Sequence, residues 1–240
     1  ARGIYSDAFG YDLIGSTYRI TPKELNVDLA AGVHFDKTYD GDANVTQTLS
    51  KGTNYTLTNF VAGEGAGITL DETVRGQYAD KNAGADKAVT FDGLTLTGTG
   101  AGNYKLNRTN LTSTGTIAQR MLGITFTTAP VTKVYDGTTN AIAALSKGEH
   151  YTLTNFAAGE GDGITITGTG TFADKNVGMK AANFSALTLT GEGAGNYQLA
   201  TTTHTGTGEI TPRDLTLTAD EKSVTQGEAL PAFTGRAEGF

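Results

Sequence analysis

Residues 55–68 read YTLTNFVAGEGAGI, and residues 151–164 read YTLTNFAAGEGDGI. The two stretches share twelve of their fourteen residues and begin 96 positions apart. Each opens with apolar and polar residues in alternation, which is typical of a half-buried strand, and continues into a glycine-rich segment, which is typical of a turn. The sequence therefore predicts one β-rich building block that is written twice.

The duplication extends well beyond this stretch. Three further motifs recur in the same order: Tyr-Asp-Gly at residues 39–41 and 135–137, Ala-Asp-Lys-Asn at 79–82 and 173–176, and Ala-Gly-Asn-Tyr at 101–104 and 194–197. A repeat of this length is too long for a solenoid, whose units run to about 50 residues, and fits one immunoglobulin-like sandwich of about 100 residues. We expect an all-β protein of tandem immunoglobulin-like β-sandwich modules arranged end to end as a rod.

Module boundaries follow from a second repeated element. Ile-Thr-Pro stands at residues 20–22 and 210–212, and a degraded copy, Ile-Ala-Gln, stands at residues 117–119. The residue before proline is held extended, so such a joint is short and stiff. The predicted parts are the end of a preceding module (1–20), a first sandwich (21–119), a second sandwich (120–212) and the start of a following module (213–240).

Composition excludes several classes of protein. The net charge is −7 and the Lys and Arg residues form no cluster, so nucleic acid is not an expected partner. The chain contains no apolar run near the roughly 20 residues that span a bilayer, so membrane insertion is not expected. Cysteine is absent, which removes disulfides, thiol catalysis and cysteine-based zinc sites and favours an exported protein.

One segment has the spacing of a calcium loop. Asp40, Asp42 and Asn44 form a D-x-D-x-N pattern, whereas the helix–loop–helix type of site would need Gly and Glu where Val45 and Lys51 stand. The sequence leaves two interpretations: an irregular calcium site at a module joint, or an Asp-Gly turn closed by side-chain hydrogen bonds.

Other motifs point to structure rather than to catalysis. The glycine-rich strings at residues 63–67 and 98–102 precede strand-like text, whereas a phosphate loop precedes a helix, so we expect turns there. His34, His150 and His204 show no metal-ligand spacing. We predict no catalytic residue and no cofactor, and therefore no enzyme.

Tyrosines recur in register between the two copies, at residues 39 and 135, 55 and 151, and 104 and 197. Paired tyrosines can stack on sugars, or they can pack their rings in a sandwich and tie their hydroxyls to a loop. The sequence favours packing.

In their order, these blocks resemble the YDG repeat module. The resemblance rests on KVYDGTT at residues 133–139, ADKNVG at 173–178 and the Ala-Gly-Asn-Tyr motif, and it covers residues 21–212. The first copy begins the same pattern at residues 37–41, with Asp42 where the second has Thr138. The tail from Arg213, with QGEALPAF at residues 226–233, resembles the start of an MBG-type module.

The resemblance implies a structural stalk in a large, haemagglutinin-like surface adhesin of Gram-negative bacteria, secreted by a two-partner route. It implies an extracellular location, a role in cell attachment or biofilm formation, and neighbouring modules of the same chain as partners, with a host or matrix glycan or protein as a further partner. The alternative is a carbohydrate- or protein-binding module. That alternative predicts a cluster of exposed aromatic side chains, and the absence of Trp counts against it.

Overall fold

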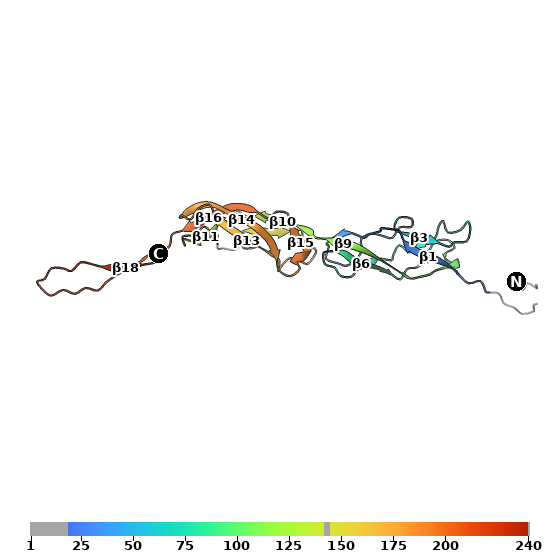
Figure 1. The fold of residues 1–240 in the computed structure, drawn as a ribbon, viewed down its shortest axis with the longest axis horizontal. Helices are drawn as coiled ribbons and strands as arrows, with labels where there is room; N and C mark the ends of the chain where they lie inside the picture. Colours follow the sequence, from blue (N-terminus) through green and yellow to red (C-terminus); the bar gives the residue numbers. More distant parts are fainter. Residues whose placement is uncertain (1–18, 142–144, 240) are drawn as a thin grey trace, which may run out of the picture. The chain divides into compact units, whose positions relative to one another are not determined.

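A computed structural model describes residues 19–141 and 145–239, so the predicted end of a preceding module lies almost entirely outside the described residues. The protein is all-β, as predicted (Figure 1). Within these described ranges, the helical content consists of two 3₁₀ turns, η1 (Ala101–Asn103) and η2 (Ala194–Asn196). Over the described ranges, no helix has the length and apolar character needed to cross a membrane.

The first repeat contains three sheets. Strand β1 (Lys23–Leu29) is central to a three-stranded sheet, with β3 (Tyr55–Thr58) antiparallel on one side and β8 (Tyr104–Leu106) parallel on the other. A four-stranded sheet has the order β2 (Lys37–Thr38), β9 (Asn110–Ala118), β6 (Gly84–Asp92) and β5 (Gly76–Tyr78). The short strands β4 (Thr69–Leu70) and β7 (Leu96–Thr97) form a separate antiparallel pair.

The second repeat has the same topology. Strand β10 (Arg120–Phe126) lies between β12 (Tyr151–Thr154) and β15 (Tyr197–Leu199), and a four-stranded sheet has the order β11 (Val131–Val134), β16 (His204–Thr211), β14 (Gly178–Thr190) and β13 (Thr165–Phe172). Here β13 and β14 are continuous, so they include the pair that corresponds to β4 and β7: Thr69 faces Thr97, and Thr165 faces Thr190. The repeated sequence therefore encodes one repeated set of strand pairings.

Burial follows the predicted alternation in both repeats. Leu25 and Val27 in β1 are fully buried, and their neighbours in the strand are exposed. In β3, Tyr55 and Leu57 are buried, and the two threonines between and after them are exposed. The tail differs from both repeats, because its strand residues are exposed. In the hairpin of β17 (Thr216–Ala219) and β18 (Gly235–Glu238), Leu217 is 80 % exposed, because this two-stranded ribbon pairs with no third strand among the described residues.

Contacts divide the chain into two compact units whose borders do not follow the sequence repeat. Unit 1 includes Ala43–Lys81 and Ala85–Thr116, with the described chain up to Lys37. Unit 2 includes the chain from Ile117 onward. It also includes two short segments that belong to the first repeat in sequence, Thr38–Asp42 and Asn82–Gly84.

The duplicated stretch is closed by hydrogen bonds to its own backbone. The Tyr55 hydroxyl accepts a hydrogen bond from the Leu70 N–H at 2.8 Å, and the Tyr151 hydroxyl accepts one from the Ile166 N–H at 2.9 Å. Both hydroxyls are buried, and losing such a bond leaves a buried N–H unsatisfied, at a cost of about 1–3 kcal/mol. This cost explains why tyrosine, and not phenylalanine, stands at both positions.

The glycine-rich loop of the stretch is built around a lysine. In unit 1, Lys51 Nζ donates to the carbonyl oxygens of Gly65 and Ile68 at 2.8 and 2.7 Å and lies 5.1 Å from the centre of the Phe60 ring. A Cβ on Gly65 would lie 2.5 Å from that ring, so only glycine fits beneath it. Lys147, Gly161 and Phe156 repeat the arrangement. The loop therefore directs its carbonyl groups at a lysine ammonium, and its glycines lie in turns, as predicted.

The fold predicts a sharp difference between two glycines of similar backbone conformation. Gly98 has φ +106°, and a Cβ there would lie 2.0 Å from the Gly67 carbonyl oxygen, whereas Gly100 has φ +83° with open space around it. Gly98→Ala and Gly100→Ala both introduce left-handed strain. We expect Gly98→Ala to lower the free energy of unfolding in urea by about 2 kcal/mol more, because overpacking adds that much. Equal losses in the two variants would show that the close approach to Gly67 does not matter.

Candidate interaction site

A hydrogen-bonded cluster in unit 2 joins two tyrosines to one carboxylate. The Tyr39 hydroxyl donates to Glu160 at 2.8 Å from Oε1 and 3.0 Å from Oε2, and the Tyr197 hydroxyl donates to Oε2 at 2.7 Å. Tyr39 comes from the first Tyr-Asp-Gly motif and Glu160 from the second Gly-Glu-Gly loop, 121 residues apart. We call Tyr39, Glu160 and Tyr197 the tyrosine–glutamate cluster.

Apolar packing surrounds this cluster. The Tyr39 and Tyr197 rings meet edge to face at 5.3 Å, and Phe156 packs on Tyr197 in the same way at the same distance. Gly41 lies over Ala157, where a Cβ on the glycine would come within 3.2 Å of the alanine Cβ. Tyr39 is 1 % exposed. The Tyr-Asp-Gly motif is thus a docking segment whose ring is buried and whose glycine permits close approach.

A second set of contacts lies in the same unit. The Asn196 side chain accepts a hydrogen bond from the Ala83 N–H at 2.8 Å and donates to Asn82 Oδ1 at 3.2 Å. Gln119 Nε2 donates to the Gly195 carbonyl oxygen at 2.9 Å. Asn196 is one of the few buried polar residues among those described, and it is buried with its amide satisfied.

Electrostatics keep the tyrosines protonated. Burial and the hydrogen bond to Glu160 raise the pKa of Tyr197 to about 12. In unit 1, the hydrogen bond to Glu64 raises the pKa of Tyr104. Because the folded-state pKa of Tyr197 exceeds the ordinary value near 10, its contribution to stability is complete below pH 10 and is lost as the pH rises through about 12.

Unit 1 contains residues that correspond to Glu160 and Tyr197 of the cluster, namely Glu64 and Tyr104. Tyr104 donates a hydrogen bond to Glu64, Phe60 packs on Tyr104 at 5.3 Å, and the Val61 N–H donates to the Tyr104 hydroxyl at 3.3 Å. These contacts repeat those of Glu160, Tyr197, Phe156 and Ala157. The exposure differs: Val61 is 47 % exposed and Ala157 is 5 % exposed.

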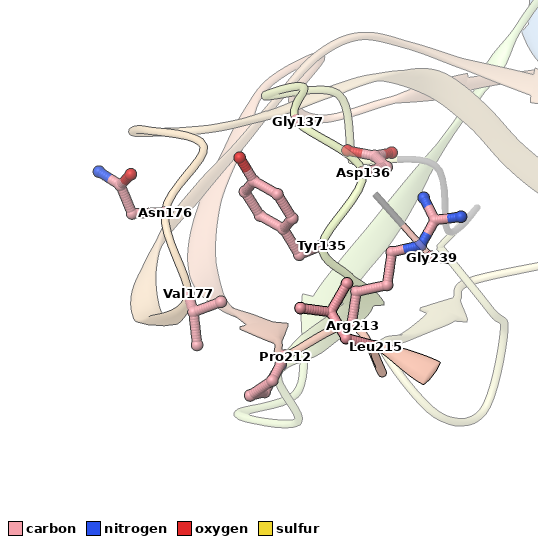
Figure 2. Close-up of a pocket in the computed structure, with 9 residues that line it drawn as sticks. All are labelled: Tyr135, Asp136, Gly137, Asn176, Val177, Pro212, Arg213, Leu215 and Gly239. Atoms are coloured by element: carbon pink, nitrogen blue, oxygen red, sulfur yellow. The ribbon is translucent and has the colours of Figure 1, made fainter. Parts of the chain in front are cut away.

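The second repeat contains its own Tyr-Asp-Gly motif, in which Tyr135 corresponds to Tyr39 of the cluster. Tyr135 is half-buried, unlike Tyr39, and it lines an open pocket of about 740 Å³ (Figure 2). The pocket is lined by Tyr135, Asp136, Gly137, Asn176, Val177, Pro212, Arg213, Leu215 and Gly239. Asn176 and Val177 correspond in sequence to Asn82 and Ala83. The pocket is therefore lined by the second-repeat counterparts of both first-repeat segments that belong to unit 2.

Asp136 in this motif is held by a lysine. Lys133 Nζ donates to Asp136 Oδ1 at 2.7 Å and to the carbonyl oxygens of Thr138 and Asn140 at 2.8 and 2.9 Å. This ammonium group, with the N–H and hydroxyl of Thr138, lowers the pKa of Asp136 to about 2. In the second repeat, these oxygens are therefore bound by the Lys133 ammonium group.

The predicted calcium residues make separate hydrogen bonds in the structure. Asp40 and Asp42 belong to unit 2, and Asn44 belongs to unit 1. Asp40 Oδ1 accepts the Asp42 N–H at 3.2 Å, which is the side-chain-closed turn expected from an Asp-Gly sequence, and the Asn44 carbonyl oxygen accepts a hydrogen bond from Lys37 Nζ at 2.9 Å. The backbone of the segment thus forms the turn, and calcium binding stays a prediction. Within the described ranges, no three His, Asp or Glu side chains group as metal ligands.

The remaining sequence motifs have structural contacts. In Ala-Asp-Lys-Asn, Asp80 pairs with Lys87 at 2.7 Å and Asp174 pairs with Lys180 at 2.5 Å. His150 Nδ1 accepts the Ser146 N–H at 2.9 Å, and the His204 ring stacks on Phe126 at 3.5 Å. Sequence reasoning missed Glu64 and Glu160; the available signal was a glutamate between two glycines in both copies.

The tyrosine–glutamate cluster can be tested by a double-mutant cycle. We expect Tyr39→Phe to lower the free energy of unfolding of unit 2 by about 1.5–3 kcal/mol, the usual range for a hydrogen bond to a charged group. The same substitution in a Glu160→Gln background should cost clearly less, because the two residues are coupled. Tyr135→Phe is the matched control and should change stability by less than about 0.5 kcal/mol, as is usual for surface positions. Additive losses from Tyr39→Phe and Glu160→Gln would contradict the coupling.

The lysine at the second Tyr-Asp-Gly motif predicts an unusual titration. We expect the Asp136 carboxyl to titrate at about pH 2 in an NMR experiment and to return toward the ordinary value near 3.9 in Lys133→Met. Its stabilising effect is therefore present above about pH 4 and lost as the pH falls toward 2. Lys147→Met is the control, because Lys147 binds the carbonyls of Gly161 and Ile164, and it should leave Asp136 unchanged. If the Asp136 carboxyl of Lys133→Met still titrated at about pH 2, Lys133 would not be the cause of the low pKa.

Comparison with known proteins identifies the repeated unit. The YDG domain matches residues 21–113 and again residues 119–205. No curated protein and no solved structure matches the chain. Since the two matched segments together cover most of its length, the chain belongs to the YDG domain family and contains two copies of the domain.

Proposed function

We propose that this chain is a structural stalk, a spacer segment of a large secreted bacterial surface adhesin that supports cell attachment or biofilm formation. The observation that carries the proposal is that unit 2 includes residues from both YDG domains. The Tyr-Asp-Gly segment of the first domain is packed in the compact unit that contains the second domain, and its Tyr39 ring is buried there. Consecutive domains that share residues in this way form a chain in which each copy depends only on its neighbours, as in other repeat proteins.

The proposed architecture is a rod of immunoglobulin-like sandwiches with domains at 21–119 and 120–212. Two observations support it. Each repeat has one three-stranded and one four-stranded sheet in matching order. The joint between the repeats is short, because β9 ends at Ala118 and β10 begins at Arg120, with Gln119 alone between them. In this proposal, residues 1–20 and 213–240 belong to flanking modules.

The non-catalytic part of the proposal rests on how the polar groups are used. Glu160 is engaged by two tyrosine hydroxyls, and Asp136 by the Lys133 ammonium. These carboxylates hold loops in place by internal hydrogen bonds. A stalk needs fixed loops of this kind at each joint. The chain contains no cysteine. An extracellular location agrees with this, because a free thiol outside the cell would be exposed to oxidation.

One observation favours the alternative of a binding module: Tyr135 and Val177 line an open pocket in unit 2. A half-buried tyrosine with apolar neighbours can stack on a sugar ring. A glycan array probed with the native chain and with Tyr135→Ala separates the two functions. A glycan signal that disappears in Tyr135→Ala would support the binding module.

The stalk predicts an extended particle in solution. A compact protein of 240 residues would have a radius of gyration of about 18 Å. We expect small-angle scattering to give a clearly larger value, and the maximum dimension to rise by a constant step when a further YDG domain is inserted between the two. A radius near the compact value, or a dimension that does not grow with domain number, would remove the basis for a spacer.

A further inference from the structure

We propose that the size of the side chain at position 157 selects the neighbour that a YDG domain accepts. Alanine there admits the Tyr-Asp-Gly segment of the preceding YDG domain. Valine, which stands at the corresponding position 61 of the first domain, matches a neighbour that presents a different segment. The inference rests on the proposed stalk and adds to it a rule for the order of its domains. We call the pair of Gly41 and Ala157 the joint contact.

The repeated sequence draws attention to this position. The duplicated stretch differs between the repeats at two of its fourteen positions: Val61 corresponds to Ala157, and Ala66 corresponds to Asp162. Ala66 and Asp162 are both exposed, whereas Ala157 is 5 % exposed and lies against Gly41. One of the two differences in an otherwise identical stretch therefore lies at the position that the Tyr-Asp-Gly segment covers in unit 2.

The joint contact is a close approach of the docked backbone to a methyl group. A Cβ on Gly41 would lie 3.2 Å from the Ala157 Cβ and 3.7 Å from Glu160 Oε1. The glycine therefore packs on the alanine, beside the carboxylate that binds Tyr39. Valine would add two methyl groups to the Ala157 Cβ, and extra carbon atoms in a well-packed contact force the neighbouring atoms to move.

Hydrogen bonds limit how far the docked segments can move. The Tyr39 N–H donates to the Ala118 carbonyl oxygen at 2.9 Å, and the Tyr39 hydroxyl donates to Glu160 Oε1 at 2.8 Å. In the second segment that unit 2 shares with the first repeat, the Ala83 N–H donates to the Asn196 side chain at 2.8 Å. A shift that made room for valine would lengthen these bonds, so the size of residue 157 and the docking of the segments are coupled.

The loop that contains this position accommodates either residue. The Val61 N–H donates to the Tyr104 hydroxyl at 3.3 Å, and the Ala157 N–H donates to the Tyr197 hydroxyl at 3.1 Å. A phenylalanine packs edge to face on each of these tyrosines at the same distance, 5.3 Å. Since the first repeat builds the same loop around valine, the need for alanine at position 157 comes from the docked segment and not from the domain itself.

Amide hydrogen exchange in the full chain tests the proposal, because two amides of unit 2 report on different events. The Ala83 N–H is bonded to Asn196 and reports on the docked segments. The Ile166 N–H is bonded to the buried Tyr151 hydroxyl and reports on the fold of the second domain itself. Local opening exposes each amide with its own free energy, so the two exchange rates can change independently.

We expect Ala157→Val to speed the exchange of the Ala83 amide at least about ten-fold, which corresponds to about 1.4 kcal/mol, while the Ile166 amide stays within about two-fold of its native rate. Ala158→Val is the matched control, because Ala158 is the next residue of the same loop and is exposed. It should leave both rates unchanged. Ala157→Gly removes a methyl group instead of adding two, and it should keep the Ala83 amide protected.

Two results would overturn the inference. If the Ala83 amide of Ala157→Val exchanged at its native rate, the size of residue 157 would not control docking. If the Ala83 and Ile166 amides were accelerated by the same factor, valine would disturb the domain itself and not the joint. Either result would leave an elongated particle in scattering, and hence the stalk, untouched. Conversely, a compact particle whose Ala83 amide alone responds to Ala157→Val would remove the stalk and keep the steric selection between the two domains.

Discussion

The structure of unit 2 depends on one carboxylate that accepts hydrogen bonds from two tyrosines of different sequence repeats. Glu160 holds Tyr197 of its own repeat and Tyr39 of the preceding one. Both tyrosine rings are buried and Glu160 is half-buried, and hydrogen bonds to a charged group contribute about 1.5–3 kcal/mol each. The consequence is that a sequence repeat and a folded unit are offset: the first Tyr-Asp-Gly motif belongs to the first repeat in sequence and is buried in unit 2.

The offset explains the pattern of identity between the two copies. Residues that close the loop, such as Lys51 and Lys147 or Tyr55 and Tyr151, are the same because each serves its own repeat. At the docking surface, both repeats contain the Tyr-Asp-Gly motif and the glutamate. Val61 and Ala157 differ at this surface, and it is there that the two copies differ in exposure.

Much of the fold could be predicted from the sequence, because strand alternation and turn glycines act locally. Leu25 and Val27 are buried as their spacing predicts, and the glycine-rich strings form turns. Leu215 and Leu217 have the same spacing and are exposed, since burial also requires a facing sheet. The tyrosine–glutamate cluster could not be predicted, because the sequence shows which residues recur and not which of two identical motifs is docked.

Solution NMR gives the most direct test of the shared unit. Because Gly41 lies over Ala157, nuclear Overhauser contacts should join the Gly41 Hα protons to the Ala157 methyl group, and the Tyr39 ring to the Tyr197 ring. We expect both sets of contacts in the native chain and their loss in Glu160→Lys. If the Tyr39 ring shows no contact with Tyr197 while Phe156 still does, the Tyr-Asp-Gly segment does not dock, and the offset between repeat and unit is wrong.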